Sequence, residues 1–343
     1  MSEHQSIWAA FNKHLNAIEP DNGILTAPMA ALHAQQVESG FIRQDWEEVQ
    51  RRVICHPKAG NRCLQVQFNP HRASRFNGSG RQQPPAGCAI HNDGCFLCRE
   101  NILWQQSGKQ IGYQIEANSN RYNALMNPFP LLPGHVVVAS EEHIGQEWNL
   151  HPDGGLDPDR IIADLADLAA RLPGYAGFYN GVGAGTSLPT HMHYHFLQAD
   201  EQHRRFPLEL EAIAARQQQP DLSCWRLTEY PLDVLHWHGN LSAVADLCSK
   251  WIRDWIAGHD NPADLTGNLI AICDEPGASV SLFFAPRSRS NGLASRQANL
   301  VGGIGGLEVL GELVLSTDKQ KRLLDSGGLD YFTLHRALAG VAA

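Results

Sequence analysis

The sequence predicts an α+β protein composed of two related halves. Segments with strand-like alternation flank segments with helical periodicity, and the order of strands, helix and strands occurs roughly twice. The length of 343 residues also exceeds what one average core requires. We place one half at residues 1–205 and the other at residues 206–343, although no literal sequence repeat links them.

Apolar periodicity locates the elements of the first half. A helix is expected near the N-terminus, where Ile7, Phe11 and Leu15 share one face. A second helix begins after Asp157, which can cap it. Residues 69–87 are rich in Arg, Gln, Gly, Ser and Pro and predict a long loop. Five segments have the pattern of strands: 63–68, 111–116, 135–139, 177–180 and 193–199.

The second half repeats the pattern with fewer elements. A helix is expected at residues 244–256, where one broad apolar stripe includes Trp251 and Trp255. This spacing favours core packing for both tryptophans, not base stacking. Strands are expected at 269–273, 280–285 and 307–315.

The charge balance excludes some classes of function. The chain carries 36 acidic and 27 basic residues, a formal net charge of −9. A protein that binds nucleic acid through bulk electrostatics needs a basic face, so we expect no nucleic-acid partner. No segment offers the ~18 consecutive apolar residues of a membrane span, and the N-terminus has no apolar signal region. We therefore expect no membrane partner and a cytoplasmic location.

Arginine supplies 21 of the 27 basic residues, and lysine only 6. The planar guanidinium matches phosphate and carboxylate geometry, so an arginine bias in an acidic chain favours pockets for small anions.

The eight cysteines are scattered, which favours reduced thiols. Only Cys95 and Cys98 form a C-x-x-C pair, a pattern typical of half a zinc site or of a redox pair. The polar loop before the pair does not fit the strand-to-helix setting of a redox motif. His143 and His191 are candidates for the other two ligands of a closed, structural site. The remaining cysteines are expected to be small buried residues: Cys55, Cys63, Cys88, Cys224, Cys248 and Cys273.

His191, His193 and His195 alternate along a predicted strand, so their three imidazoles point to one face. Two functional interpretations compete. The imidazoles could be ligands of a cupin-like metal centre, although Gln198 stands where that motif has glutamate. Alternatively, one imidazole could be a nucleophile that attacks phosphorus, because imidazole forms a labile phosphoramidate near neutral pH. A second pair, His236 and His238, is expected to be structural, and His135 is expected to orient a turn.

Several motifs in order resemble one known group of proteins. They are Phe68-Asn-Pro-His-Arg72, Cys95-x-x-Cys98, Asn127-Pro-Phe-Pro130, Pro133-Gly-His135, His143, Phe178-Tyr-Asn180-Gly181, Gly185-Thr-Ser187 and His191-x-His193-x-His195. Together they resemble the histidine-triad superfamily, and more closely its branch of galactose-1-phosphate uridylyltransferases, dinucleoside-tetraphosphate phosphorylases (ATP adenylyltransferases) and GDP-hexose phosphorylases. The resemblance covers about residues 64–200 and, more loosely, Phe284-Ala-Pro-Arg287 and Gly306-Leu-Glu308-Val-Leu-Gly311.

The resemblance implies a histidine-triad-like fold, with antiparallel sheets and packed helices, in which the second half is degenerate. His193 would be the catalytic nucleophile, with His195 beside it. The implied ligands of a structural zinc ion are Cys95, Cys98, His143 and His191. The implied substrate-binding residues are Asn180, Gly185, Thr186 and Ser187, with Arg72 and Arg287 as phosphate clamps.

The implied activity is nucleotidyl transfer through a covalent nucleotidyl-histidine. The substrate would be a nucleoside polyphosphate or a nucleotide sugar, and the acceptor phosphate or a sugar phosphate. Relatives are often homodimers. His195 departs from the glutamine that these transferases usually carry at the third triad position, and matches the histidine-triad hydrolases instead. A hydrolase with water as acceptor is therefore an alternative, as are a cupin-like oxygenase and a catalytically silent, zinc-stabilised nucleotide sensor.

Overall fold

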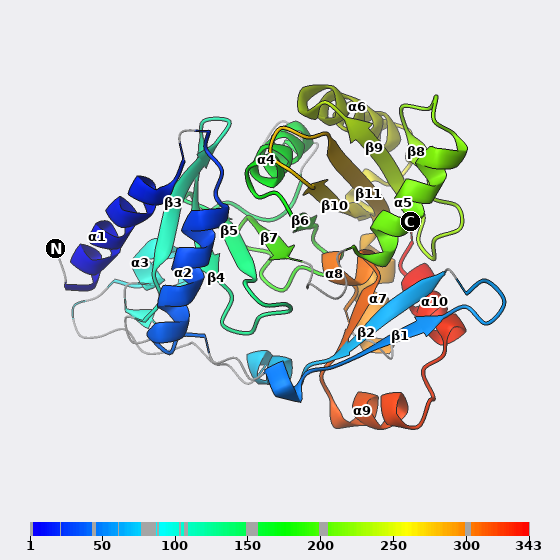
Figure 1. The fold of residues 1–343 in the computed structure, drawn as a ribbon, viewed down its shortest axis with the longest axis horizontal. Coiled ribbons are helices and arrows are strands. Elements are labelled where there is room, and N and C mark those ends of the chain that lie inside the picture. Colours follow the sequence, from blue (N-terminus) through cyan, green and yellow to red (C-terminus); the bar gives the residue numbers. More distant parts are fainter. Residues whose placement is uncertain are drawn as a thin grey trace.

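A computed structural model describes residues 3–20, 22–42, 46–60, 62–76, 87, 89–102, 104–105, 109–148, 157–198, 205–298 and 303–342 (Figure 1). Its centre is a nine-stranded antiparallel sheet. The strands, in spatial order, are β3 (Gly112–Ala117), β4 (Asn120–Met126), β5 (Val136–Ser140), β7 (His193–Gln198), β6 (Tyr175–Asn180), β10 (Leu265–Cys273), β11 (Val280–Ser288), β9 (Leu235–Gly239) and β8 (Trp225–Arg226). The fold class predicted from the sequence is confirmed.

One order of elements occurs twice in this sheet. The series β4, β5, α4 (Pro158–Arg171), β6, β7 is followed by β8, β9, α6 (Leu241–Ala257), β10, β11. The two series meet where β6 pairs with β10, and there Asn180 lies directly opposite Asn268. This repetition agrees with two related halves. The division at residues 205 and 206 stays a prediction, because the sheet continues across the β6–β10 pair.

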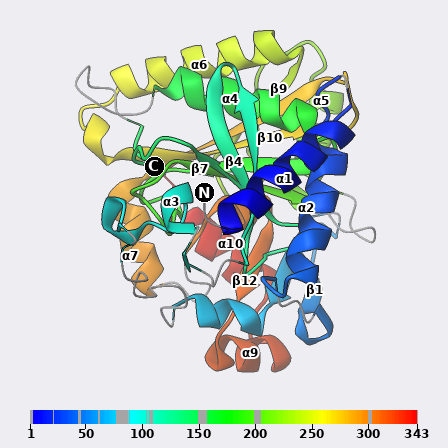
Figure 2. The same ribbon diagram turned by 90° about the vertical axis from the view of Figure 1, so that its left-hand side faces the viewer.

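Helices α4 and α6 pack side by side on one face of the sheet (Figure 2). Helix α4 begins as its sequence predicts, because the Asp157 side chain accepts a hydrogen bond from the Asp159 backbone N–H at 3.0 Å. The apolar stripe of α6 faces the same core. Trp251 and Trp255 stack on each other and pack against that core, as expected.

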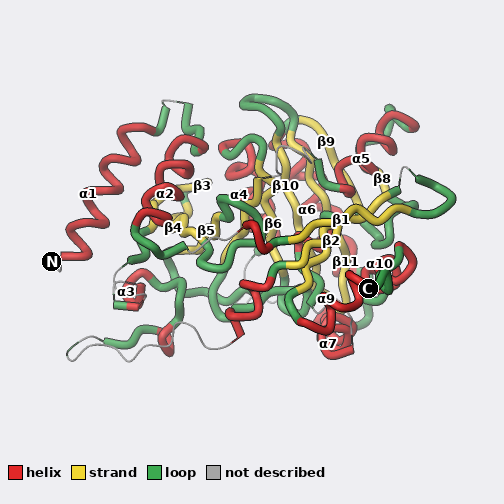
Figure 3. Tube along the Cα trace, turned by 60° about the horizontal axis from the view of Figure 1, so that its bottom comes forward, coloured by secondary structure: helices red, strands yellow, loops and turns green. Residues whose placement is uncertain are grey.

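The opposite face of the sheet is covered at one end of the molecule by a second core. A three-stranded sheet contributes β1 (Gln50–Cys55), β2 (Cys63–Phe68) and β12 (Glu312–Leu315), with β12 parallel to β2. Short helices complete this layer: α5 (Pro207–Gln218), α8 (Gly306–Val309) and α10 (Tyr331–Ala339). Figure 3 shows α1 (Glu3–Ile18) and α2 (Thr26–Glu38) at the other end. The elements not yet given are α3 (Arg99–Ile102), α7 (Arg289–Ala298) and α9 (Asp318–Asp325).

Two predictions of secondary structure need correction. Residues 307–315 are not one strand but α8 followed by β12, because the Glu308 carboxylate accepts the Gly305 N–H and begins a helical turn. Gly311 then reverses the chain with φ +100°. The predicted loop 69–87 begins with a 3-10 helix, η2 (Pro70–Phe76), and most of its remainder lies outside the described residues.

The prediction of reduced, buried cysteines is wrong for one pair. Cys55 and Cys63 lie directly opposite each other where β1 joins β2, and they form a disulfide. The sequence spacing hid this, because only the hairpin register brings the two sulfurs together. Cys55 is exposed and Cys63 is half-buried. Cys248 and Cys273 are buried as expected and Cys224 is half-buried, whereas Cys88 lies outside the described residues.

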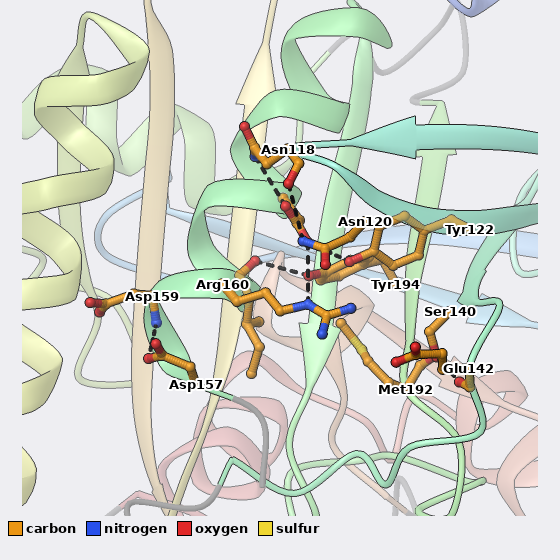
Figure 4. A network of polar contacts seen from close by, with 12 residues as sticks. Asn118, Asn120, Tyr122, Ser140, Glu142, Asp157, Asp159, Arg160, Met192 and Tyr194 are labelled. Carbon is orange, nitrogen blue, oxygen red and sulfur yellow. Dashed lines mark hydrogen bonds and ion pairs between the residues drawn. The ribbon is translucent and has the colours of Figure 1, made fainter.

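A buried carboxylate ties helix α4 to the sheet that carries His193 and His195. Asp164 accepts hydrogen bonds from Asn118, Asn120 and Tyr122, at 3.0, 2.9 and 2.5 Å. Figure 4 shows Asn118, Asn120 and Tyr122 of this network lying close together. The Tyr194 hydroxyl, from β7, donates to the Ile161 carbonyl of the same helix at 3.0 Å. These bonds satisfy a carboxylate that burial would otherwise destabilise, and they fix β7 against α4.

Among the described residues, no helix combines the length and the apolar character that crossing a bilayer requires.

Candidate active site and metal centre

Cys95, Cys98, His143 and His191 converge on one point, as the sequence predicted. Cys95 Sγ lies 3.3 Å from His191 Nδ1, and Cys98 Sγ lies 3.2 Å from His143 Nδ1. The two Nδ1 atoms are 3.2 Å apart, and all four ligand atoms lie within 4.8 Å of one another. Ligands of a tetrahedral zinc ion are separated by about 3.5 Å, given metal–ligand bonds of about 2.0–2.3 Å. The four residues therefore fit a closed metal site.

The residues around the cluster favour the ligand protonation states that bind a cation. His191 Nε2 lies 2.8 Å from the Ser140 carbonyl oxygen, so Nε2 donates and the Nδ1 lone pair faces the cysteines. Cys98 donates a hydrogen bond that lowers the pKa of Cys95; burial opposes this effect and His191 adds to it. Asn101 holds the loop by donating to the Cys95 carbonyl at 3.0 Å. A thiolate beside an unprotonated imidazole nitrogen is the donor pattern that zinc prefers.

His193 begins β7 and is 3% exposed. Its Nδ1 lies 2.7 Å from the His191 carbonyl oxygen, so Nδ1 carries the proton and Nε2 keeps its lone pair. Desolvation by burial lowers the pKa of His193 to about 4, so the imidazole is neutral near pH 7. A neutral, oriented imidazole is the protonation state that nucleophilic attack requires.

Gln146 holds the backbone around His193, and the sequence analysis missed it. Its side-chain oxygen accepts the His193 N–H at 2.7 Å. Its side-chain nitrogen donates to the carbonyls of His193 and Asn180, at 2.9 and 3.2 Å. Gln146 precedes the residues 149–156 that are not described, and no sequence motif marks it.

His195 is paired with a second histidine that the sequence analysis assigned only to a turn. His135 Nε2 lies 2.9 Å from His195 Nδ1, and His135 Nδ1 accepts the Leu131 N–H at 3.2 Å. His135 therefore donates from Nε2, which leaves the proton of neutral His195 on Nε2. The ring of His195 stacks on Phe178 at 5.0 Å and meets His193 edge-on at 4.9 Å.

A cavity of about 610 Å³ opens over these histidines. Both His193 and His195 line it, together with five of the six residues expected to bind substrate: Arg72, Asn180, Gly185, Thr186 and Ser187. Thr186 Oγ1 is buried and has no hydrogen-bond partner among the described residues. Apolar and aromatic residues, including Phe96, Leu125 and Phe129, line other parts of the wall. An unsatisfied hydroxyl on the wall of this cavity is a group to which a polar ligand could bind.

Glycines bring two backbone segments together at the cavity rim. Gly185 has φ +97°, and a Cβ atom there would lie 2.4 Å from Gly305 Cα and 2.6 Å from the Ile304 carbonyl oxygen. Only glycine permits this approach. The Gly306 N–H, in turn, donates to Asn180 Oδ1 at 2.8 Å. The second half of the chain thus forms part of the cavity, which the sequence motifs of the first half could not show.

Arg287, the second predicted phosphate clamp, is not among the described residues that line the cavity. Its hydrogen-bond partners belong to the protein itself. It is 1% exposed and donates to Asn268 Oδ1 and to the Val341 carbonyl, both at 2.8 Å. Asn268 donates to Asn180 Oδ1 at 2.8 Å. Arg287 therefore supports Asn180 through Asn268, whereas Arg72 lines the cavity directly.

Comparisons with known proteins agree with this arrangement. A family model described as a "Domain of unknown function (DUF4922)" matches residues 31–198. No curated protein matches the sequence. The fold resembles the crystal structure of yeast Ap4A phosphorylase Apa2, with a TM-score of 0.60 and 15% identity over 91% of this chain and 95% of that one. The same enzyme in complex with Ap4A gives a TM-score of 0.57 and 13% identity over 92% and 95%. At this identity the likeness concerns the fold.

Proposed function

We propose that this protein is a nucleotidyltransferase of the phosphorylase type, which acts on a nucleoside polyphosphate or a nucleotide sugar through a covalent nucleotidyl-His193. The observation that carries the proposal is the neutral, oriented imidazole of His193 on the wall of a cavity large enough for a nucleotide. The fold shared with yeast Ap4A phosphorylase, whose structures contain AMP and Ap4A, supports nucleotides as the substrate class.

In the first step, His193 Nε2 forms a bond to the α-phosphorus. The bond from that phosphorus to the bridging oxygen breaks, and the leaving phosphate or sugar phosphate takes the electron pair. The Nε2–H of neutral His195 can donate a hydrogen bond to the leaving oxygen as negative charge develops there, since His135 holds the other nitrogen of His195 as an acceptor. Thr186 can donate to the phosphoryl oxygens, where negative charge develops.

In the second step, a phosphate oxygen attacks the same phosphorus, and the bond from phosphorus to His193 Nε2 breaks. The nitrogen regains its lone pair, and the product is a nucleoside diphosphate when inorganic phosphate is the acceptor. Arg72, from η2, would bind phosphate oxygens at the cavity wall. Positioning and charge stabilisation supply most of the rate in such phosphoryl chemistry.

Zinc bound at Cys95, Cys98, His143 and His191 would have a structural role, because all four ligand positions of a tetrahedral site are taken by the protein. The ion would connect the loop before α3, which carries Cys95 and Cys98, to the segment that leads into β7. His191 belongs to that segment and lies two residues before His193. The geometry does not support the cupin-like alternative, since His193 Nδ1 is bonded to a carbonyl oxygen and His191 Nδ1 faces the cysteines.

The test of the proposal is chemical trapping. Incubation with a nucleotide labelled at the α-phosphorus should give an acid-labile labelled protein, and His193→Ala should abolish the label. His14→Ala, a change of an exposed histidine in α1, serves as the control and should label fully. Full labelling of the His193 variant would place the nucleophile elsewhere.

A hydrolase remains the second candidate, because His195 occupies the third triad position and its Nε2–H can donate a hydrogen bond to a leaving group. Product analysis with and without inorganic phosphate separates the two. Formation of nucleoside diphosphate only with phosphate supports the phosphorylase; nucleoside monophosphate at the same rate in both reactions supports the hydrolase.

A further inference from the structure

A second cavity lies beneath α5, on the same face of the sheet as the catalytic histidines but four strands away. A row of directly paired residues connects the two places: His195 opposite Phe178, Phe178 opposite Ile270, Ile270 opposite Phe283, and Phe283 opposite His236. Directly opposite residues share a face of a sheet. The ring of His236 stacks on Phe283 at 4.4 Å, much as His195 stacks on Phe178.

The cavity is small and polar. Its volume is about 30 Å³, room for about two or three water molecules or one small ion. Residues of α5 form one wall and residues of β9, β11 and the β10–β11 turn form the other. The polar lining residues are Arg205, Glu209, Arg216, His236, His238, Asp274, Ser279 and Ser281. Asp274 and Ser279 are exposed, so the cavity opens to solvent at that rim.

His236 is the least satisfied polar group in this cavity. It is fully buried, at 0% exposure, and neither ring nitrogen has a hydrogen-bond partner among the residues that the structure describes. Leaving such a group unpaired destabilises the folded protein. Burial, and then the nearby Arg216 cation, lower the pKa of His236 to about 3. The neutral ring therefore offers one N–H donor at physiological pH, and a ligand that accepts hydrogen bonds would satisfy it.

Arg216 adds positive charge to the cavity, and the nearby Asp274 carboxylate offsets only part of it. Its Nε atom is buried without a hydrogen-bond partner, and no described carboxylate forms an ion pair with it. The two acids of the cavity are engaged by Arg205 instead. Asp274 accepts from Arg205 at 2.9 Å, and Glu209 accepts from Arg205 at 3.3 Å and from the Phe206 N–H at 2.8 Å.

We propose that this α5 cavity is a second binding site, separate from the catalytic one, for a small tetrahedral oxyanion of the phosphate or sulfate class. Arg216 and His236 are the principal donors, and His238 with Ser281, whose Nδ1 and Oγ lie 3.0 Å apart, completes the polar lining. Such an anion accepts several hydrogen bonds at once and matches the guanidinium geometry. The cavity would hold the inner oxygens of the anion, and the rest of the anion would extend to the rim that is open to solvent. The proposal does not depend on the catalytic reaction.

The decisive experiment locates the anion directly. Crystals of the full chain are soaked in selenate, a tetrahedral anion whose anomalous scattering reveals its position. The expected result is a peak within hydrogen-bond distance of Arg216 and His236, present in the wild type and absent in Arg216→Gln. Water alone in the cavity of the wild-type crystal, whatever binds elsewhere, overturns the proposal.

Solution binding provides the second measurement. Phosphate and sulfate are titrated calorimetrically into the wild type, Arg216→Gln and Arg336→Gln, all carrying His193→Ala to prevent turnover. Arg336 is the matched control, because it is an exposed arginine in the last turn of α10 as Arg216 is in the last turn of α5. We expect Arg216→Gln to raise the Kd of the α5 cavity at least about tenfold, given the strength of charge-assisted hydrogen bonds.

The outcomes separate the two possible ligands and the two sites. Binding of both anions at similar affinity indicates a general oxyanion site, and a preference for phosphate indicates a phosphate site. An unchanged Kd in Arg216→Gln, with a normal circular dichroism spectrum, contradicts the proposal. A catalytic site that fails to label with nucleotide leaves these measurements unaffected, so failure of the proposed function is recognised independently.

Discussion

His135 Nε2 lies 2.9 Å from His195 Nδ1, and the Leu131 N–H donates to the other nitrogen of His135. This chain of hydrogen bonds fixes the tautomer of both imidazoles and connects the chain after β4 to the third histidine of the triad. His135 is thus a positioning residue for His195, and its place on the sequence, after Pro133 and Gly134, gave no sign of this contact.

Replacing His135 should impair the step in which His195 Nε2–H donates a hydrogen bond to the leaving oxygen. In His135→Phe the donor to His195 Nδ1 is lost, so we expect kcat to fall about tenfold or more while KM changes little. Steady-state rates and the pH profile of kcat measure this. His135→Gln can still donate from its amide and should recover part of the rate. Equal rates for the wild type and the Phe variant would show that the contact is only structural.

The metal cluster predicts a specific pattern of zinc loss. The purified protein should contain about one zinc ion per chain, and Cys98→Ser should lose most of it and unfold at a lower temperature, since metal binding stabilises the folded state. Elemental analysis and thermal unfolding measure the two effects. Cys224→Ser is the control, because Cys224 is a half-buried thiol outside the cluster. Iron in place of zinc, or zinc retained in the Cys98 variant, would contradict the assignment.

Gly185 should not tolerate a side chain. Gly185→Ala must both adopt a positive φ and place Cβ within 2.4 Å of Gly305, so we expect a loss of several kcal/mol, about 3 or more, or closure of the cavity rim. Gly327 has φ +71° but nothing within 4 Å, so Gly327→Ala should cost only about 1 kcal/mol. Urea unfolding compares the two. Similar losses of stability would mean that the positive φ, and not the contact with Gly305, is the reason for glycine at position 185.

Arg72 and Arg287 should give opposite phenotypes, although the sequence motifs suggested one role for both. Arg72 lines the cavity and also donates to the Phe129 carbonyl, so Arg72→Gln should weaken nucleotide binding about tenfold and destabilise the fold less than Arg287→Gln does. Arg287 is buried among carbonyl and amide acceptors, so Arg287→Gln should destabilise the fold by about 2 kcal/mol or more. Calorimetric titration and urea unfolding of both variants distinguish these effects. If Arg287→Gln instead weakened nucleotide binding and left the stability unchanged, Arg287 would be a substrate-binding residue.

Glu209 should make the stability depend on pH. Desolvation raises the pKa of this carboxyl group to about 7, from an ordinary value of 4.5. As pH rises through this interval, the unfolded chain loses its proton first, so stability falls between pH 4.5 and 7 and stays constant above it. Glu209→Gln cannot ionise. The difference in unfolding free energy between wild type and variant should change by about 3 kcal/mol across the interval in phosphate-free buffer. A constant difference would contradict the shifted pKa.

The sequence determined those features that depend on local pattern. Alternation along residues 191–195 predicted three histidines on one face of a strand. The structure places His193 and His195 on β7, whereas His191 precedes the strand and belongs to the metal cluster. Asp157 marked the start of α4. The C-x-x-C pair and two distant histidines predicted a cluster that the structure confirms as a possible metal site. Periodicity and ligand chemistry act over a few residues, so they can be recognised without coordinates.

Only the tertiary structure decided which residues meet across strands and between the halves. The pairing of Cys55 with Cys63, of His135 with His195, and of Asn180 with Gly306 depends on register and on how the second half folds back over the sheet. His236 illustrates the same point, because its isolation beneath α5 depends on what packs over β9. Hydrogen bonds require atoms to lie within about 3 Å, and spacing along a chain does not determine that distance.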